Sequence, residues 1–260
     1  MMDLLVVSGA SGSLGVALLR QALGQGYAVL ALVRNEQSAE KLSATISHEQ
    51  LHMAVVDFAL PDCAETLWGA IHKVRFGSLN TSDIAKVSLV FNAACYPPGG
   101  TAKSPARELQ AWRHVMTVNA FSVDLCLSKL SPLVEQGVLT SVLGVSSLSA
   151  YVGLPGDACY AGSKSTLERI IESYALDWRD KPVSMGLLIP SSFASNLQRE
   201  ASSGGASATS AAKVADSALS ALAEGLKKFR YPADPAAEKV LAELSSVKRE
   251  HLLTLVQGYC

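Results

Sequence analysis

Strand-length apolar runs alternate with longer amphipathic stretches over most of this chain, and this alternation limits the possible folds more than any other feature. Each run is apolar almost throughout, which is typical of a strand buried on both faces of its sheet. Strands that alternate with helices build a parallel sheet through crossover connections, so the pattern predicts an α/β fold. The predicted strands are Leu4–Ser8, Ala28–Val33, Leu51–Val56, Val87–Asn92, Val138–Val145 and Val183–Ile189.

Helices are predicted between and after these strands. They cover Leu14–Leu23, Ser38–Ile46, Cys63–Lys73, Arg107–Leu130, Cys159–Trp178, Ala211–Leu226 and Pro235–Ser246. We find no internal repeat and no interdomain linker, so residues 1–260 are predicted to form a single domain. The low-complexity segment Ala201–Ser210 follows the last predicted strand and is interpreted as a loop.

Charge and composition exclude several classes of protein. Lys and Arg number 22 against 23 Asp and Glu, without a large basic cluster, which argues against nucleic-acid binding. Hydrophobic residues make up 49 % of the chain and charged residues 17 %, so intrinsic disorder is excluded for most of its length. No apolar run reaches the roughly 20 residues that span a bilayer, and no secretory signal is visible. The five cysteines are scattered and never form a CxxC pair, so a reduced, cytoplasmic protein is expected.

A glycine-rich turn follows the first predicted strand and leads into the first helix. Glycine at 9, 12 and 15 allows a tight turn, close approach of a pyrophosphate to the backbone, and close packing of helix on strand. The helix N-terminus adds free N–H groups and a positive dipole. The turn is therefore predicted to bind a dinucleotide, with a glycine-rich turn that binds nothing as the alternative. The predicted contacts are Gly9, Ser11, Gly12, Ser13, Leu14 and Gly15.

The end of the second predicted strand indicates which dinucleotide is bound. An acidic residue there would bind the ribose 2′-hydroxyl of NAD, whereas an arginine suits the 2′-phosphate of NADP. This chain has Arg34 and Asn35 at that place and no carboxylate. A guanidinium can bind a phosphate in a bidentate manner, so NADP(H) is predicted in preference to NAD(H). The alternative is that Arg34 is a solvated surface residue.

Further residues follow the third and fourth predicted strands, whose carboxyl ends face the same crevice. Asp57 is predicted to accept a hydrogen bond from the adenine amino group, and the small side chains of Ala93 and Ala94 to let the cofactor pass close to the backbone. Phe58 and Asn92 are predicted cofactor contacts as well. Each of these residues could equally be a turn cap or a packing residue.

A tyrosine and a lysine stand four residues apart at the start of the long helix before the last strand. Tyr160 and Lys164 therefore share one helix face, and their phenol and ammonium groups point into the same space. A neighbouring cation favours the phenolate, so Lys164 is expected to lower the pKa of Tyr160 towards a range useful for acid–base catalysis.

Between Leu4 and about Leu197 the sequence resembles the short-chain dehydrogenase/reductase family, and its shorter subgroup in particular. Ser147 precedes Tyr160 by 13 residues and follows Asn119 by 28, as in the family's catalytic tetrad. The resemblance implies a Rossmann-type, doubly wound parallel sheet with helices on both faces. The matching elements are Gly9, Gly12, Gly15, Asn92-Ala93-Ala94, Asn119, Ser147, Tyr160 and Lys164.

The resemblance also implies a role for each residue of the tetrad. Tyr160 is the general acid in carbonyl reduction, and Ser147 donates a hydrogen bond to the substrate oxygen. Lys164 lowers the pKa of Tyr160 and binds the nicotinamide ribose, while Asn119 anchors a water that relays protons. The further predicted cofactor contacts are Tyr160 and Lys164 themselves, together with Pro190, Ser192 and Phe193.

Three features depart from the family's usual pattern. The GxxGxxG spacing of the turn is more usual in the longer epimerases and dehydratases. Pro190-Ser191 stands where Pro-Gly is usual, with Ser195 in place of a threonine, so the hold on the nicotinamide carboxamide is in question. The last part of the chain lacks the usual glycine-rich strand, which leaves the family's tetramer interface open.

The zinc-protease pattern HExxH also occurs, between His48 and His52. A shared metal requires both histidines on one helix face, but here the pattern runs from a helix end into a strand. No metal is therefore predicted.

The predicted function is NADPH-dependent reduction of a ketone or aldehyde to an alcohol. The alternatives are an epimerase or dehydratase that uses bound NAD(P), and a non-catalytic NADP-sensing regulator. The predicted partners are a small carbonyl or alcohol substrate, with no nucleic acid or membrane, and copies of the same chain in a homodimer or homotetramer. Residues 191–230 are predicted to contain a substrate lid, and Arg107–Leu130 either an interface helix or a buried core helix.

Overall fold

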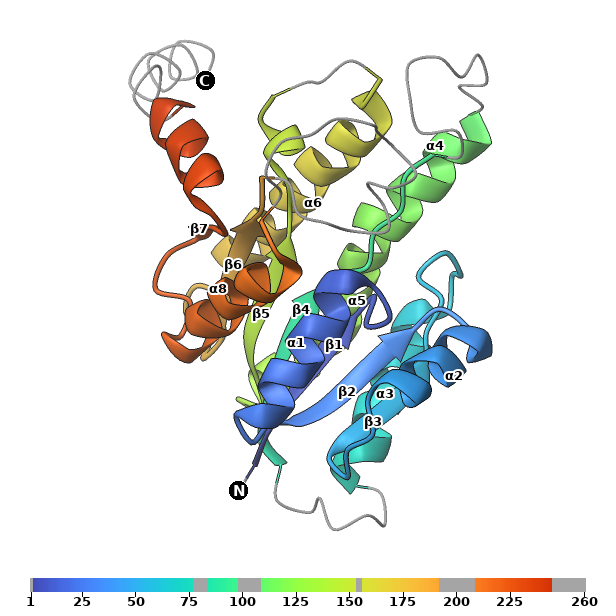
Figure 1. The fold of residues 1–260 in the computed structure, drawn as a ribbon. Coiled ribbons are helices and arrows are strands. Elements are labelled where there is room, and N and C mark those ends of the chain that lie inside the picture. Colours follow the sequence, from blue (N-terminus) through green and yellow to red (C-terminus); the bar gives the residue numbers. More distant parts are fainter. Residues whose placement is uncertain (1, 77–83, 98–108, 153–155, 192–208, 245–260) are drawn as a thin grey trace.

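The computed structural model of the protein describes residues 2–76, 84–97, 109–152, 156–191 and 209–244. Within these residues, seven parallel strands form one sheet in the order β3-β2-β1-β4-β5-β6-β7 (Figure 1). The strands are β1 (Met2–Ser8), β2 (Ala28–Val33), β3 (Leu51–Val55), β4 (Ile84–Phe91), β5 (Leu139–Val145), β6 (Ser184–Ile189) and β7 (Arg230–Pro232). The strand order reverses between β1 and β4, and in such sheets ligands bind at the carboxyl ends of the strands beside this point.

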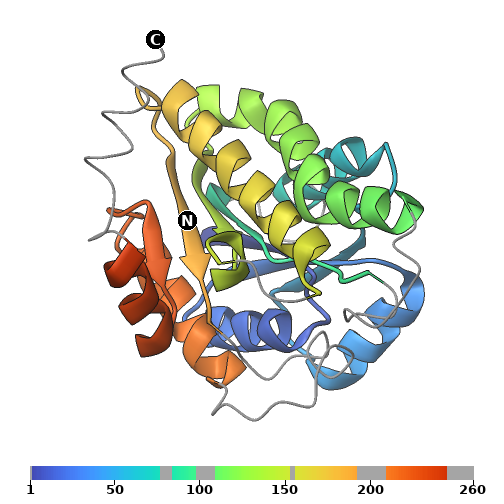
Figure 2. The same cartoon turned by 90° about the horizontal axis from the view of Figure 1, so that it is seen from above.

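Helices cover both faces of the sheet. They are α1 (Ser13–Gly24), α2 (Glu36–Thr45), α3 (Cys63–Phe76), α4 (Leu109–Met116), α5 (Ser122–Glu135), α6 (Ala158–Asp177) and α8 (Ala211–Ala223), and residues 235–244 are helical as well. Figure 2 shows α3, α5 and α6 on one face and α1, α2 and α8 on the other. This is the predicted Rossmann-type α/β fold, and it confirms the helices expected on both faces.

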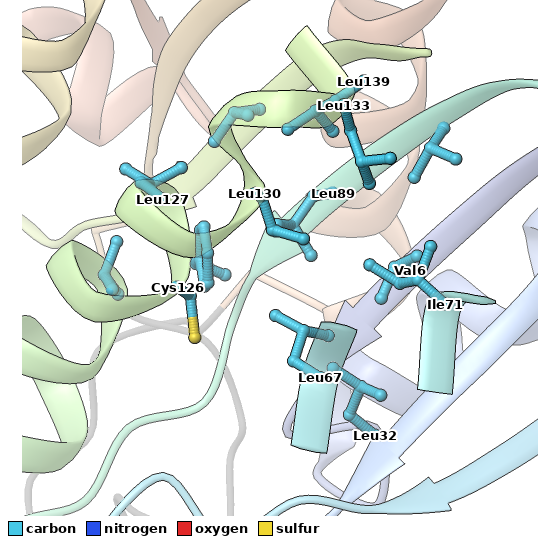
Figure 3. Close-up of a cluster of buried hydrophobic side chains, with 14 of the residues drawn as sticks. Val6, Leu32, Leu67, Ile71, Leu89, Cys126, Leu127, Leu130, Leu133 and Leu139 are labelled. Atoms are coloured by element: carbon cyan, nitrogen blue, oxygen red, sulfur yellow. The ribbon is translucent and has the colours of Figure 1, made fainter. Parts of the chain in front are cut away.

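The larger hydrophobic core lies between the sheet and α3, α5 and α6 (Figure 3). Leu67 and Ile71 of α3 and Leu127 and Leu130 of α5 are fully buried there, together with Leu89 of β4. Truncating a buried leucine of this kind to alanine typically costs about 2–5 kcal/mol. A second core joins the opposite face of the sheet to α1, α2 and α8. The sheet that carries the strand ends is therefore held firmly on both sides.

The predicted helix Arg107–Leu130 differs in form from the observed one. Its described part begins with α4 at Leu109, passes through a π-helical turn, η1 (Thr117–Phe121), and continues as α5 to Glu135. Such π turns are often found at functional sites, and this one contains the buried Asn119. A regular 3.6-residue repeat does not reveal an added residue of this kind.

The helix α5 also runs past its predicted end at Leu130, although Pro132 lies inside it. Pro132 has no N–H to donate to the Ser128 carbonyl four residues earlier. The Ser131 hydroxyl donates to that carbonyl at 2.9 Å instead. A side chain thus replaces the missing backbone hydrogen bond, and the helix continues.

A seventh strand, β7, was not among the predicted strands. Its three residues pair in parallel with β6, from Leu187 with Arg230 to Ile189 with Pro232. A segment so short shows no apolar run, and its single sheet partner rather than its own pattern makes it a strand. The other strands match the predictions to within three residues at each end.

Candidate active site

A cleft of about 590 Å³ lies at the carboxyl ends of the central strands. Its lining includes every residue predicted to bind the cofactor at the ends of the first four strands except Gly15 and Asn35. Sequence patterns did not single out the remaining lining residues. The full lining is Gly9, Ser11, Gly12, Ser13, Leu14, Leu32, Arg34, Ser38, Val56, Asp57, Phe58, Asn92, Ala93, Ala94, Cys95, His114 and Val118.

The glycine-rich turn has the backbone geometry that its sequence predicts. Gly9 has a φ of +63°, and a Cβ atom there would lie 2.8 Å from the Cα of Ala93. A Cβ atom on Gly15 would lie 2.4 Å from the Gly9 oxygen, so helix α1 can pack on the turn only with glycine at this position. Gly12 is the N-cap of α1 and brings no side-chain acceptor to the first N–H groups. These groups are left to face the cleft, where a phosphate would accept from them.

Two polar side chains hold the turn against β4. The Ser8 hydroxyl accepts hydrogen bonds from the backbone N–H groups of Asn92 and Ala93, each at 2.9 Å. The Asn92 amide donates to the carbonyls of Ser8 at 3.0 Å and Gly9 at 3.2 Å. Asn92 therefore shapes the turn as well as lining the cleft. Ser8 was missed by the sequence reasoning, although its place directly before Gly9 could have indicated it.

At the end of β2, the two predicted cofactor contacts lie in different environments. Arg34 lines the cleft and makes no ion pair with any described residue. The Asn35 side chain instead caps α2 by accepting from the Ser38 N–H at 2.9 Å, so Asn35 faces its own helix rather than the cleft. Ser38 joins Arg34 in the lining. A free guanidinium, a hydroxyl and a helix N-terminus thus meet in one corner, and together they suit a phosphate.

Asp57 also has two functions available to it. Its Oδ1 accepts from the Ala59 N–H at 2.9 Å, which fixes the turn after β3. The residue lines the cleft beside Phe58. The cleft therefore combines a glycine-rich turn at a helix N-terminus, a cation without an ionic partner among the described residues, and an acceptor, and these residues fit a nicotinamide dinucleotide.

The structure brings the predicted tetrad together at the catalytic end. Tyr160 and Lys164 come from the first turns of α6, Ser147 follows β5, and Asn119 comes from the π turn. All four are buried, with exposed fractions between 1 % for Asn119 and 9 % for Ser147 and Tyr160. The ammonium of Lys164 lies 5.7 Å from the centre of the Tyr160 ring and donates to the Val145 carbonyl at 2.7 Å.

Asn119 fixes the loop that follows β4. Its Oδ1 accepts from the Cys95 N–H at 2.8 Å, and its Nδ2 donates to the Cys95 carbonyl at 3.0 Å and to the Ser163 hydroxyl at 2.9 Å. Both backbone polar groups of Cys95 are therefore held by one side chain. The next residue, Tyr96, lies against Tyr160: the two rings stack with centres 4.0 Å apart and planes 12° apart.

The electrostatics of Tyr160 differ from the expectation. Burial raises the pKa of the Tyr160 phenol well above its ordinary value, and the nearby Tyr96 and Asp157 raise this pKa further. A hydrogen bond with Ser147 acts in the opposite direction. The expected lowering of this pKa by Lys164 was wrong: Lys164 is not among the influences on Tyr160, and burial dominates because it removes the water that would solvate a phenolate.

The pKa of Lys164 also differs from its ordinary value. Burial lowers the pKa of its ammonium to about 8, while the thiol of Cys95 and the carboxylate of Glu168 oppose this change. The charged form is disfavoured because the ammonium is taken out of water. Tyr160 is therefore a neutral proton donor near neutral pH, beside a lysine that titrates close to the physiological range.

Several predicted residues lie elsewhere. Pro190 is buried after β6, where its carbonyl accepts from the Leu148 N–H at 3.3 Å. Ser192, Phe193 and Ser195 lie outside the described residues, as do all residues of the predicted lid between 192 and 208. Of the zinc-protease pattern, His48 lies in the loop before β3 and His52 within that strand. No cluster of metal-ligating side chains and no helix able to cross a membrane occurs in the described part of the chain.

Comparison with known proteins adds relatives in sequence. The chain is 25 % identical over 187 residues to dehydrogenase/reductase SDR family member 4 of Rattus norvegicus. It is 24 % identical over 189 residues to a 3beta-hydroxysteroid dehydrogenase of Mediterraneibacter gnavus. The alignments cover 71 % and 72 % of this chain but 63 % and 64 % of the relatives, so the match spans less than two thirds of their length.

Solved structures share the fold over nearly the whole chain. A short-chain dehydrogenase from Streptomyces avermitilis superposes with a TM-score of 0.77 at 19 % identity, covering 99 % of this chain and 98 % of that one. One from Burkholderia cenocepacia, in complex with NADP, gives 0.74 at 22 % identity over 96 % and 95 %. One from Burkholderia phymatum, in complex with NAD, gives 0.74 at 19 % identity over 98 % and 95 %.

The family itself is shown by a direct match. The family model described as short chain dehydrogenase matches residues 3–205, which is well over half of the chain. This region contains the glycine-rich turn, the cleft and all four tetrad residues. The protein therefore belongs to the short-chain dehydrogenase/reductase family.

Proposed function

We propose that this chain is an NADPH-dependent oxidoreductase that reduces a ketone or aldehyde to the alcohol. The observation that carries the proposal is the burial of Tyr160, Ser147, Lys164 and Asn119 in one place beside the cleft at the strand ends. The bound nicotinamide would supply the hydride. The protein's own contribution is placement, desolvation and proton transfer.

In this proposal Tyr160 is the general acid and Ser147 a second hydrogen-bond donor to the substrate. The Tyr160 phenol, kept neutral by burial, donates its proton to the carbonyl oxygen as negative charge develops there. The Ser147 hydroxyl donates a second hydrogen bond to the same oxygen. The Ser147 Oγ is itself held in place by the Ser149 N–H, which donates to it at 3.2 Å.

In the proposed proton transfer, Lys164 and Asn119 have supporting roles. An ammonium has three N–H groups, and one of them is used by the Val145 carbonyl, so the others are free to bind ribose hydroxyls. Both amide hydrogens of Asn119 are used by Cys95 and Ser163. We therefore assign the anchoring of the relay water to the backbone carbonyl of Asn119.

The preference for NADP(H) over NAD(H) is part of the proposal. Arg34 has no ionic partner among the described residues and stands beside Ser38 and the N-terminus of α2. These groups offer a 2′-phosphate a charged partner, whereas none of them favours a bare 2′-hydroxyl.

The remaining proposals concern the setting of the site. We propose one domain over residues 1–260, with the substrate lid within 191–230, and a cytoplasmic location. The free thiols of Cys63, Cys95, Cys126 and Cys159 support a reduced compartment.

We propose a homodimer or homotetramer formed through the helical face of α5 and α6. Phe121 and Leu125, one turn apart, are 49 % and 44 % exposed, and Leu176 at the end of α6 is 60 % exposed. The mass in solution, measured by light scattering, tests this. We expect Leu125→Asp to yield a monomer, and a wild-type monomer would refute the proposal.

The decisive experiment for the activity is a carbonyl panel. Consumption of NADPH and of NADH is followed with aldehydes, ketones, diketones and β-ketoacyl thioesters. We expect turnover with at least one class and faster turnover with NADPH. Product formation without net NADPH consumption would indicate the epimerase or dehydratase that the GxxGxxG spacing favours. Tight NADPH binding without any turnover would indicate a cofactor-sensing regulator.

A further inference from the structure

A buried carboxylate lies directly behind the catalytic residues. Glu168 is on α6, one helical turn beyond Lys164, and its side chain is 3 % exposed. Its Oε1 accepts from the Ser146 hydroxyl at 2.5 Å, and its Oε2 accepts from the Tyr151 phenol at 2.6 Å. A buried charge is costly unless it is paired and hydrogen-bonded, so this arrangement is a built feature of the fold.

An arginine from the edge of the sheet completes the arrangement. Arg230, the first residue of β7, donates from Nε to the Tyr151 phenol at 2.9 Å. Its Nη2 lies 3.9 Å from Oε2 of Glu168. The Arg169 guanidinium, largely exposed, lies 3.7 Å from the same oxygen. The carboxylate thus joins α6 to the residues that directly follow β5 and η2 (Leu148–Ala150), and to β7.

Glu168 affects the proposed catalytic groups in two ways. Ser146 is the residue directly before Ser147, so its side chain ties the backbone of Ser147 to α6. The charge of Glu168 also acts on Lys164. The other groups around Lys164 are Cys95 from the loop after β4, Tyr160 from α6 and the Val145 carbonyl from β5. Glu168 is the one carboxylate among the named influences on Lys164.

Building on the proposed function, we propose that Glu168 is a positioning residue for the active site. Through Ser146 it fixes Ser147 relative to Tyr160, and its negative charge keeps Lys164 in the ammonium form. Neither effect requires contact with the substrate or the cofactor. The arrangement also links Arg230, the first residue of β7 and the last of the predicted lid region, to the proposed catalytic groups.

The electrostatic half of the proposal has a definite sign. Burial lowers the pKa of Lys164 and the Glu168 carboxylate opposes this. Removal of that charge therefore lowers the pKa of Lys164 further. Because the ammonium form binds the ribose hydroxyls, NADPH affinity is lost as pH rises through this pKa. Without the Glu168 charge, the loss begins at lower pH.

The experiment measures the dissociation constant of NADPH by fluorescence, together with kcat, as a function of pH. Glu168→Gln is compared with the wild type and with Glu172→Gln, a matched variant one turn further along α6 at a half-exposed carboxylate. We expect Glu168→Gln to bind NADPH about tenfold more weakly than wild type near pH ~8.5 but nearly equally near pH ~6.5, as for a shift of roughly one unit. Glu172→Gln should follow the wild-type curve.

Two further variants separate placement from charge. Glu168→Asp keeps the charge but shortens its reach, so we expect the wild-type pH curve for NADPH binding with kcat about tenfold lower. Ser146→Ala removes one neutral donor, so kcat should fall several-fold while NADPH binding is unchanged at every pH. These variants also answer the question if Glu168→Gln does not fold.

Each possible result supports or refutes one half of the proposal. An NADPH-binding curve of Glu168→Gln that superposes on the wild-type curve overturns the electrostatic half of the proposal. A wild-type kcat in both Glu168→Asp and Ser146→Ala overturns the positional half. Because NADPH binding is measured apart from turnover, an inactive wild type that still binds NADPH would refute the proposed carbonyl reduction but leave the test of Glu168 valid. A chain that binds neither NADPH nor NADH would refute both.

Discussion

At the cofactor end of the site, the groups offered to a ligand are largely backbone: the glycine-rich turn, the first N–H groups of α1, and the strand ends beside Ala93 and Ala94. At the catalytic end the groups are side chains, and every one of the four is buried. The cofactor end forms an open cleft whose cation, Arg34, is exposed. The catalytic end is covered by the ring of Tyr96, which stacks on Tyr160.

In the proposed mechanism, one fold therefore separates cofactor binding from proton transfer. Backbone N–H groups and a solvated arginine bind phosphates with little dependence on pH. Desolvated side chains such as Tyr160 and Lys164 have shifted pKa values, and in the proposed mechanism their protonation states control the reaction. Substitutions at the two ends are therefore expected to affect different quantities.

The largest effect is expected for Tyr160→Phe. The change removes the proton donor but keeps the ring that stacks on Tyr96, so kcat should fall by about 10³-fold. NADPH binding should stay within about twofold of wild type, because the cofactor cleft does not involve this hydroxyl. Steady-state kinetics and fluorescence titration measure the two quantities. Near-normal turnover would contradict the assignment of the acid.

Next in size is the expected effect of Gly15→Ala, at the other end. The added Cβ would lie 2.4 Å from the Gly9 oxygen and 2.7 Å from the Cα of Ala10, so the turn and α1 must separate. We expect the free energy of unfolding to fall by about 3 kcal/mol and NADPH binding to weaken strongly. Denaturant titration gives the first value. Gly24→Ala, where the Cβ meets open space, is the control and should be almost neutral.

A smaller and more selective effect is expected for Arg34→Ala. Loss of an exposed charge-assisted contact should weaken NADPH binding by about tenfold. NADH has no 2′-phosphate, so its dissociation constant should not change. Titration of both cofactors against both proteins measures the selectivity. Equal weakening of NADPH and NADH would show that Arg34 supports the fold of the cleft rather than the phosphate.

The smallest effect is expected for Tyr96→Phe and concerns pH. Burial, followed by Tyr96, raises the pKa of Tyr160, so removal of the Tyr96 hydroxyl should lower that pKa. Carbonyl reduction requires protonated Tyr160 and is lost as pH rises through its pKa. The loss should therefore begin at lower pH in the variant, as measured by kcat/KM across the alkaline range. A shift to higher pH would contradict the stacking account.

Short sequence patterns were sufficient to predict most of the residues that line the cofactor end. The glycine-rich turn, the cation after β2 and Asp57 after β3 each depend on a few consecutive residues, and the structure places them on one cleft. Asn35 is the exception, because the same local chemistry that suggested a ligand contact makes it a helix cap. The resemblance and spacing that identified the tetrad selected four residues that are all buried in the structure.

Contacts between segments far apart in the sequence could not be predicted from such short patterns. The stacking of Tyr96 on Tyr160 depends on Asn119, which lies in a π turn that no repeat reveals. The arrangement around Glu168 joins it to Tyr151 and Arg230, which are 79 residues apart. Arg230 lies in β7, which is a strand because of its neighbour β6 and not because of its own sequence.

The central claim is that the protein transfers a hydride from NADPH to a carbonyl carbon, with Tyr160 as the acid. The most direct measurement uses NADPH that carries deuterium at both C4 positions of the nicotinamide, with the best carbonyl substrate of the panel and mass spectrometry of the product. The account predicts one deuterium on the carbinol carbon and an equal amount of NADP formed. Product that contains no deuterium, with the NADPH unconsumed, would contradict it.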